Sequence, residues 1–186
     1  CHGATPERGV NAIVKMAALV AALDTDFRRE LAAADGDEVL GTSTINLGMV
    51  QGGTRSNIVA DACTLKVDMR VTPGLQTQGD ALWMLNDFVK RIDESASVQL
   101  TSQSAALDTQ ADHPGIRRLQ GCGANLVGAP WFCDAAFLAA AGTPSIAIGP
   151  GSIAQAHTKD EHIAIEDLEA GAAFFAEFLK TLVTWS

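Results

Sequence analysis

The stretch CTLKVDMRV at residues 63–71 decides the fold class, because its side chains alternate between apolar and polar along its whole length. A period of two places the apolar side chains on one face of a strand and the polar ones on the other. Such a strand lies half buried in an antiparallel sheet. The dipeptide Pro73-Gly74 is expected to end it. Residues 42–50 are predicted as a second strand, with a glycine turn at residues 51–54 between the two.

Helical periodicity flanks these two strands. Apolar residues recur every three or four positions over residues 10–23, which predicts a helix that extends toward Leu31. A second helix is predicted over residues 82–92 and a short third strand over residues 97–101. The order helix, strand, strand, helix, strand matches a β-α-β-β-α-β ferredoxin-like unit without its first strand. We therefore expect residues 1–105 to form such a domain and the chain to be a fragment.

Residues 106–186 contain longer irregular stretches and are expected to form a second domain segment. A helix is predicted to start at residues 112–114 and another to span residues 135–141. A closing amphipathic helix has its apolar face between residues 168 and 182. Residues 145–148 are predicted as a short β run between the last two helices. The chain is thus expected to be α/β (α+β), with an αβα segment at its C-terminal end.

Composition excludes several classes of function. The 186 residues include 13 lysines and arginines against 22 aspartates and glutamates, which gives a net charge of −9. A protein that binds a phosphate backbone needs a basic face, so we expect no nucleic-acid partner. No apolar run approaches the length of a bilayer span, so we expect no membrane partner. Four cysteines without a C-x-x-C motif favour a reducing, cytoplasmic location.

Several polar residues are candidates for chemistry, and each also has a purely structural interpretation. His157 lies in a polar loop after a glycine turn, where an imidazole can be a metal ligand or simply solvated. His2 lies at a strand-to-helix corner or is an exposed terminal residue. Asn57 can bind a substrate carboxylate or cap its own turn. Arg70, on the polar face of its strand, can contact a carboxylate or pair with Asp68.

Two other patterns have weaker structural context. Residues 149–154 match the dinucleotide-binding motif G-x-G-x-x-A. However, Pro150 lacks the N–H that a phosphate loop would use, and no long helix is predicted behind it. Cys1 can be an N-terminal nucleophile with its own amine as base, although trimming of a longer chain explains it more simply.

A set of short motifs occurs in a fixed order along the chain. They are His2-Gly3-Ala4-Thr5-Pro6, Gly52-Gly53 with Asn57, Asp68-Met69-Arg70, Pro73-Gly74, Asp134-Ala135, Gly142-Thr143-Pro144, Gly149-Pro150-Gly151, and His157 with Asp160-Glu161. Together they resemble the family of acetylornithine deacetylase, succinyl-diaminopimelate desuccinylase, aminoacylase and glutamate carboxypeptidase, over nearly the whole chain. The resemblance implies a ferredoxin-like lid and dimerisation domain, residues 1–105. It also implies that residues 106–186 are the C-terminal segment of a metallohydrolase catalytic domain.

The resemblance also implies a mechanism and roles for individual residues. In such enzymes two zinc ions, with cobalt or manganese as alternatives, bridge a water and lower its pKa, so that hydroxide attacks an amide carbonyl. His157 matches the last metal ligand. His2 matches the lid histidine that reaches the partner subunit's site and stabilises the oxyanion. Four residues match positions that bind or surround the substrate: Asn57, Arg70, Gly149 and Gly151.

The chain also departs from the family pattern. The His-x-Asp ligand pair, the bridging aspartate and the Glu-Glu pair that supplies the catalytic base precede the lid in the family and are missing here. A catalytic zinc takes three protein ligands, so we expect this chain alone to retain no zinc and to be inactive. The expected parent enzyme is a homodimer that cleaves an N-acyl amino acid or a dipeptide. The alternative is a noncatalytic dimerisation or binding module of the same family.

Overall fold

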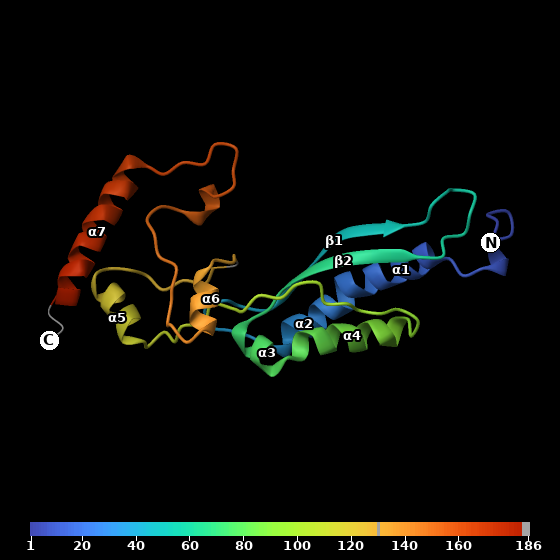
Figure 1. Cartoon of the computed structure of the whole chain (residues 1–186), viewed down its shortest axis with the longest axis horizontal. Coiled ribbons are helices and arrows are strands. Elements are labelled where there is room, and N and C mark those ends of the chain that lie inside the picture. The colour runs from blue at the N-terminus through green and yellow to red at the C-terminus, as the bar shows by residue number, and fades with distance from the viewer. Residues whose placement is uncertain (130, 184–186) are drawn as a thin grey trace. The chain divides into compact units, whose positions relative to one another are not determined.

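The computed structural model describes residues 1–129 and 131–183, and the chain divides into two compact units (Figure 1). The first unit spans Cys1–Ala106 with a short return at Gly128, and the second contains the remaining residues from Leu107 onward. Helices and a small antiparallel sheet make up the described chain, which confirms the mixed α and β fold class.

The sheet of the first unit consists of two antiparallel strands, β1 (Thr44–Gly52) and β2 (Cys63–Arg70). The first residue of β1 lies opposite the last residue of β2, and the register shifts at Gly48. Residues of β2 alternate between half buried and exposed along its whole length, as the sequence predicts. Cys63 is half buried, because it lies at the end of the strand next to the loop.

A long helical rod packs beside this sheet. It consists of α1 (Ala12–Ala22), a π-helical turn η2 (Leu23–Phe27) and α2 (Arg28–Ala34), which confirms the predicted helix. Asn11 caps the rod, since its side-chain oxygen accepts the backbone N–H groups of the second and third residues that follow it. A 3-10 turn, η1 (Pro6–Arg8), precedes the cap.

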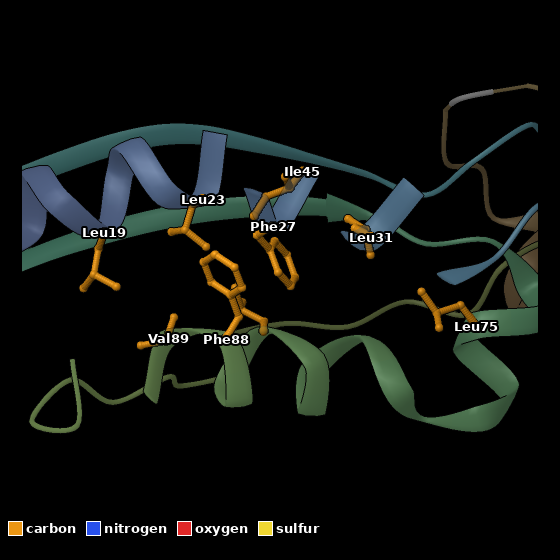
Figure 2. Close-up of a cluster of buried hydrophobic side chains, with 9 residues drawn as sticks. Leu19, Leu23, Phe27, Leu31, Ile45, Leu75, Phe88 and Val89 are labelled. Carbon is orange, nitrogen blue, oxygen red and sulfur yellow. The ribbon is translucent and has the colours of Figure 1, made fainter. Parts of the chain in front are cut away.

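The core of the first unit lies between the rod, β1 and a second pair of helices, α3 (Pro73–Gln78) and α4 (Asp80–Ile92). Figure 2 shows the rod and α4 facing one another across this cluster. The buried apolar side chains are Leu19, Leu23, Phe27, Leu31, Ile45, Leu75, Leu85, Phe88 and Val89. The rings of Phe27 and Phe88 lie 5.2 Å apart between centroids and are tilted by 55°.

Four of these core residues, between Leu19 and Leu31, are spaced by four along the rod. An α-helix has 3.6 residues per turn, so a strict spacing of four drifts around its axis. The π turn between Leu23 and Phe27 is wider and offsets that drift. All four side chains therefore stay on the side of the rod that faces α4.

One prediction for the first unit is wrong. Residues 97–101 form no strand, because the described residues place no partner strand beside them. Ala96 and Val98 instead pack against the core without backbone pairing. The strand β2 ends before Pro73-Gly74, as predicted. These two residues also begin α3, since a proline fits the first helical position, where its missing N–H is not needed.

Within its described residues, the second unit contains three helices and a short 3-10 turn. They are α5 (Pro114–Gly121), α6 (Ala135–Ala140), η3 (Ile153–Gln155) and α7 (Ile165–Val183). All three helices follow the sequence prediction. The predicted β run at residues 145–148 is not a strand. The hydroxyl of Thr109 takes the place of a strand partner, because it donates to the carbonyl of Ser145 (2.5 Å) and accepts its N–H (3.0 Å).

A polar contact ties the beginning of the rod to the end of α4. The ammonium of Lys15 lies 3.0 Å from the carboxylate of Asp93 and 2.8 Å from the hydroxyl of Ser95. The same carboxylate accepts the hydroxyl of Ser95 (2.6 Å) and its backbone N–H (3.0 Å). The hydrogen bond from the Ser95 hydroxyl, followed by that from Lys15, lowers the pKa of Asp93 to about 2.

This contact predicts an acid-dependent stability. A carboxyl whose pKa is lowered by folding stabilises the fold above its ordinary value of 3.8, and that contribution disappears as the pH falls toward about 2. Asp93→Asn should remove this part of the pH dependence, measured by urea unfolding between about pH 5 and pH 2. Asp61→Asn, which removes an exposed carboxylate, should retain it. Identical pH profiles for native protein and Asp93→Asn would contradict the assignment.

A second prediction concerns Gly171 in α7. Alanine is about 1 kcal/mol better than glycine inside a helix, so Gly171→Ala should stabilise α7 if nothing opposes it. However, a Cβ there would lie only 2.7 Å from the ring of Pro150. We expect a net loss of about 1 to 3 kcal/mol, measured by native-state hydrogen exchange of α7. Gly121→Ala, where a Cβ meets nothing within 4 Å, should cause no loss; stabilisation by Gly171→Ala would refute the packing argument.

Candidate functional site

The N-terminal segment pairs with the loop between β1 and β2. The N–H of Gly3 donates to the carbonyl of Asn57 (2.7 Å), and the N–H of Val59 donates to the carbonyl of Cys1 (3.0 Å). These bonds form an isolated antiparallel bridge at His2. The structure therefore brings two of the candidate residues, His2 and Asn57, onto adjacent backbone segments at one tip of the first unit.

The side chains of His2 and Asn57 are both exposed at this tip. The imidazole of His2 is oriented locally, because its Nδ1 accepts the backbone N–H of Ala4 at 3.1 Å. Asn57 lies in a turn closed by a bond from the N–H of Ile58 to the carbonyl of Arg55 (3.2 Å). Backbone groups alone close this turn, so the structure does not use the Asn57 side chain as its cap.

Arg70 lies at the opposite end of β2. Its guanidinium binds the carboxylate of Asp68 with two bonds, Nε to Oδ1 at 2.8 Å and Nη2 to Oδ2 at 2.9 Å. Both side chains are more than half exposed. A strand rises by about 3.3 Å per residue, so the ends of the eight-residue β2 are on the order of 20 Å apart. Within one chain, the structure does not bring Arg70 together with His2 and Asn57.

His157 lies in a loop of the second unit with its backbone in the left-handed region, at a φ of 61°. Its N–H donates to the carboxylate of Glu161 at 3.0 Å, and its ring is exposed. Among residues 1–129 and 131–183, no three His, Cys, Asp or Glu side chains are placed to share a metal ion. The structure thus positions His157 and Glu161 near one another without completing a metal centre.

The loop of Gly149 and Gly151 is anchored on α7. Pro150 packs where Gly171 leaves room, and Gly151 has a φ of +83°, which favours glycine. Gly171 is not among the residues predicted from the sequence, although an isolated glycine inside a helical pattern is a signal of close packing. Only the three-residue turn η3 follows this loop, and it is shorter than the helix that a dinucleotide motif requires.

A shallow groove of about 440 Å³ lies between α2 and α4 and contains none of the candidate residues. Arg91 spans it, with its guanidinium 2.7 Å from Glu30, 3.1 Å from Asp87 and 4.9 Å from the ring centre of Phe88. The hydrogen bond from Arg91 lowers the pKa of Glu30. The charges in this groove already satisfy one another, so we do not regard it as the site.

Within the described part of the chain, no helix is long and apolar enough to span a bilayer.

Comparison with solved structures relates the fold to two peptidases. A tripeptidase from Staphylococcus aureus superimposes with a TM-score of 0.71 at 22% identity, over 97% of this chain and 48% of that chain. The aminopeptidase PepT from Bacillus cereus superimposes with a TM-score of 0.63 at 22% identity, over 96% of this chain and 47% of that chain. At this level of identity the likeness shows the fold.

Comparison of sequences identifies the family. Acetylornithine deacetylase from Salmonella arizonae is 31% identical over 172 residues, which cover 87% of this chain and 44% of that enzyme. The Salmonella paratyphi B enzyme matches equally well, so the chain spans less than half the length of these relatives. Residues 1–96, more than half of the chain, match the M20 family model described as a peptidase dimerisation domain. The chain therefore belongs to the M20 peptidase family.

Proposed function

We propose that this chain is the lid domain and the C-terminal catalytic segment of a metal-dependent amidohydrolase. Its substrate would be an N-acyl amino acid, as in the acetylornithine deacetylases that it resembles, or else a small peptide. The observation that carries this proposal is the pair of exposed polar side chains, His2 and Asn57, on adjacent backbones of a dimerisation domain.

The chemistry of amide hydrolysis gives this pair a role. Attack of hydroxide on the carbonyl carbon places negative charge on the carbonyl oxygen, and hydrogen-bond donors directed at that oxygen lower the barrier. His2 would donate to the oxyanion, and the Asn57 amide would donate to the carboxylate of the substrate. Gly149 and Gly151, which carry no side chains, would leave room for the substrate at the pocket wall.

The described residues do not fit a metal centre on their own. A catalytic zinc takes three protein ligands, and no such cluster occurs among the described residues. The ions, zinc or else cobalt or manganese, would therefore belong to the whole enzyme, to which this chain would contribute His157. We propose on this basis that the isolated chain is inactive. We also propose a cytoplasmic location, because all four cysteines are free.

The distance along β2 supports a homodimer. Arg70 lies at the end of β2 that is remote from the loop of Asn57, and the two ends of this strand are on the order of 20 Å apart. One lid therefore cannot bring Arg70 to the same small substrate as His2 and Asn57. In a dimer, His2 and Asn57 would reach the substrate of the partner subunit, while Arg70 would serve a different substrate. Arg70 would then exchange Asp68 for the substrate carboxylate, since a guanidinium binds either one with two bonds.

The surface of the first unit also suits a second copy of this chain. Four large apolar side chains of its N-terminal region and β1 are at least 58% exposed: Val10, Val14, Met49 and Val50. In the described chain, β1 pairs only with β2, so its other edge has free backbone groups. Exposed apolar side chains and a free strand edge are both typical of protein interfaces, and we propose that the dimer contact lies in this region.

A noncatalytic dimerisation or binding module is the second candidate function. The incomplete metal centre among the described residues favours it. Such a module would use the same lid surface but would not hydrolyse an amide.

The first prediction here concerns zinc and activity. The isolated chain should bind less than one zinc ion and hydrolyse neither N-acetylornithine nor a tripeptide, because it supplies too few ligands. Supplied with a polypeptide that carries the family's upstream ligands and base, it should become active. In that enzyme His2→Asn should lower kcat about 10²- to 10³-fold, and His162→Asn should have little effect.

Two outcomes would separate the candidates. Two zinc ions and activity in the isolated chain would contradict the proposed division of ligands. A correctly assembled enzyme that stays inactive would favour the noncatalytic module.

The second prediction concerns assembly. Val14→Lys should shift the chain from dimer to monomer in sedimentation equilibrium, because a charge would be buried in the proposed contact. Trp83→Lys, at a side chain that is 66% exposed on α4, should leave the dimer intact. Dissociation by Trp83→Lys but not by Val14→Lys would place the interface elsewhere.

A further inference from the structure

We propose that Gly3 and Ala4 are positioning residues, which hold His2 as a hydrogen-bond donor through Nε2. The ring would then present a fixed donor to an oxyanion. The nature of this ligand rests on the proposed function, whereas the tautomer of His2 rests on the geometry alone.

A hydrogen bond from the backbone fixes the tautomer of His2. Its Nδ1 accepts the N–H of Ala4 at 3.1 Å, and a ring nitrogen that accepts a hydrogen bond carries no proton. In the neutral imidazole the hydrogen is therefore on Nε2, the nitrogen on the far side of the ring. The Ala4 N–H thus selects the tautomer in which the outer nitrogen is a donor, as stabilisation of an oxyanion requires.

His162 shows that the local backbone sets this choice. Its Nδ1 lies 2.8 Å from the carbonyl oxygen of Asp160. A carbonyl oxygen only accepts hydrogen bonds, so the hydrogen of the neutral His162 ring must be on Nδ1. Of these two exposed histidines, His2 presents Nε2–H and His162 does not. The half-buried His113 is held like His2, because its Nδ1 accepts the backbone N–H of Gly115 at 3.2 Å.

The backbone of Gly3 lies close to the backbone of Asn57. A Cβ on this residue would lie 3.0 Å from both the carbonyl carbon and the carbonyl oxygen of Asn57, and 3.2 Å from its Cα. These are backbone atoms, which cannot rotate away as a flexible side chain does. A side chain at position 3 would therefore push the segment that carries His2 away from Asn57 and stretch the 2.7 Å bond between them.

The donor of His2 indicates the charge of the ligand. The Nε2–H of His2 is a donor, so it suits an anionic oxygen. The chain as a whole carries a net charge of −9, so its overall field does not attract an anion. Recognition at this tip would depend on directed donors, and hence on the backbone that positions them.

Nuclear magnetic resonance of the full chain with ¹⁵N-labelled histidine tests the inference without any need for activity. At about pH 8, above the ordinary histidine value of ~6.5, the ring-nitrogen shifts of His2 should show the Nε2–H tautomer. His162 should show the Nδ1–H tautomer in the same spectrum. The Ala4 amide should be protected from hydrogen exchange. A mixture of tautomers at His2, or a freely exchanging Ala4 amide, would overturn the proposal.

Variants separate the two positioning residues. Gly3→Ala should give a tautomer mixture at His2 and shift the backbone signals of Asn57. Gly36→Ala, where a Cβ meets nothing within 4 Å, should change neither. Ala4→Pro removes the donor N–H and should also abolish the single tautomer at His2.

Unchanged backbone signals of Phe27 and Phe88, in the core of the first unit, would show that these variants remain folded. An unaltered His2 signal in Gly3→Ala or in Ala4→Pro would refute the role of that residue. If the tautomer is confirmed but His2→Asn leaves the assembled enzyme fully active, the proposed function fails while the positioning inference stands.

Discussion

Packing of the helical rod on α4 is the interaction on which the first unit depends. A two-stranded sheet is at best marginally stable in water, and β1 and β2 are the two strands that the described chain pairs. Phe27 and Leu31, both fully buried, and Phe88 therefore provide the stability that the sheet lacks. The loop between the strands, which carries Asn57, has a fixed position because the strands below it are held by this core.

The second unit has much less core of its own. Its buried apolar side chains among the described residues are Ile116, Leu119 and Ala136. The apolar face predicted for the closing helix stays largely exposed, with Leu168 at 55% and Leu179 at 58%. The half-buried side of α7 instead includes Gly171, where Pro150 packs. A larger catalytic domain, as in the proposed function, would cover the exposed face, since burial of such a surface is strongly favourable.

The sequence predicts those elements whose signals are local. Alternation in residues 63–71 and helical spacing in residues 10–31 correctly predict β2 and the rod. Prediction fails where the outcome depends on distant partners. Residues 97–101 and 145–148 have strand-like sequences, but a strand exists only where another backbone pairs with it. Apolar runs of this kind therefore indicate an extended backbone, and the tertiary structure decides whether that backbone pairs as a strand.

The candidate site shows the same limit. Spacing alone does not place His2 near Asn57. The family resemblance gave each residue a role, and the bonds at Gly3 and Val59 show that their backbone segments are adjacent. Arg70 lies apart, because a strand separates its two ends by its own length. The side chains of His2 and Asn57 are exposed, so their hydrogen-bond donors stay in contact with water and carry no desolvation penalty. In the proposed dimer, a second subunit would close over these donors, and Arg70, at the far end of β2, would serve a different substrate.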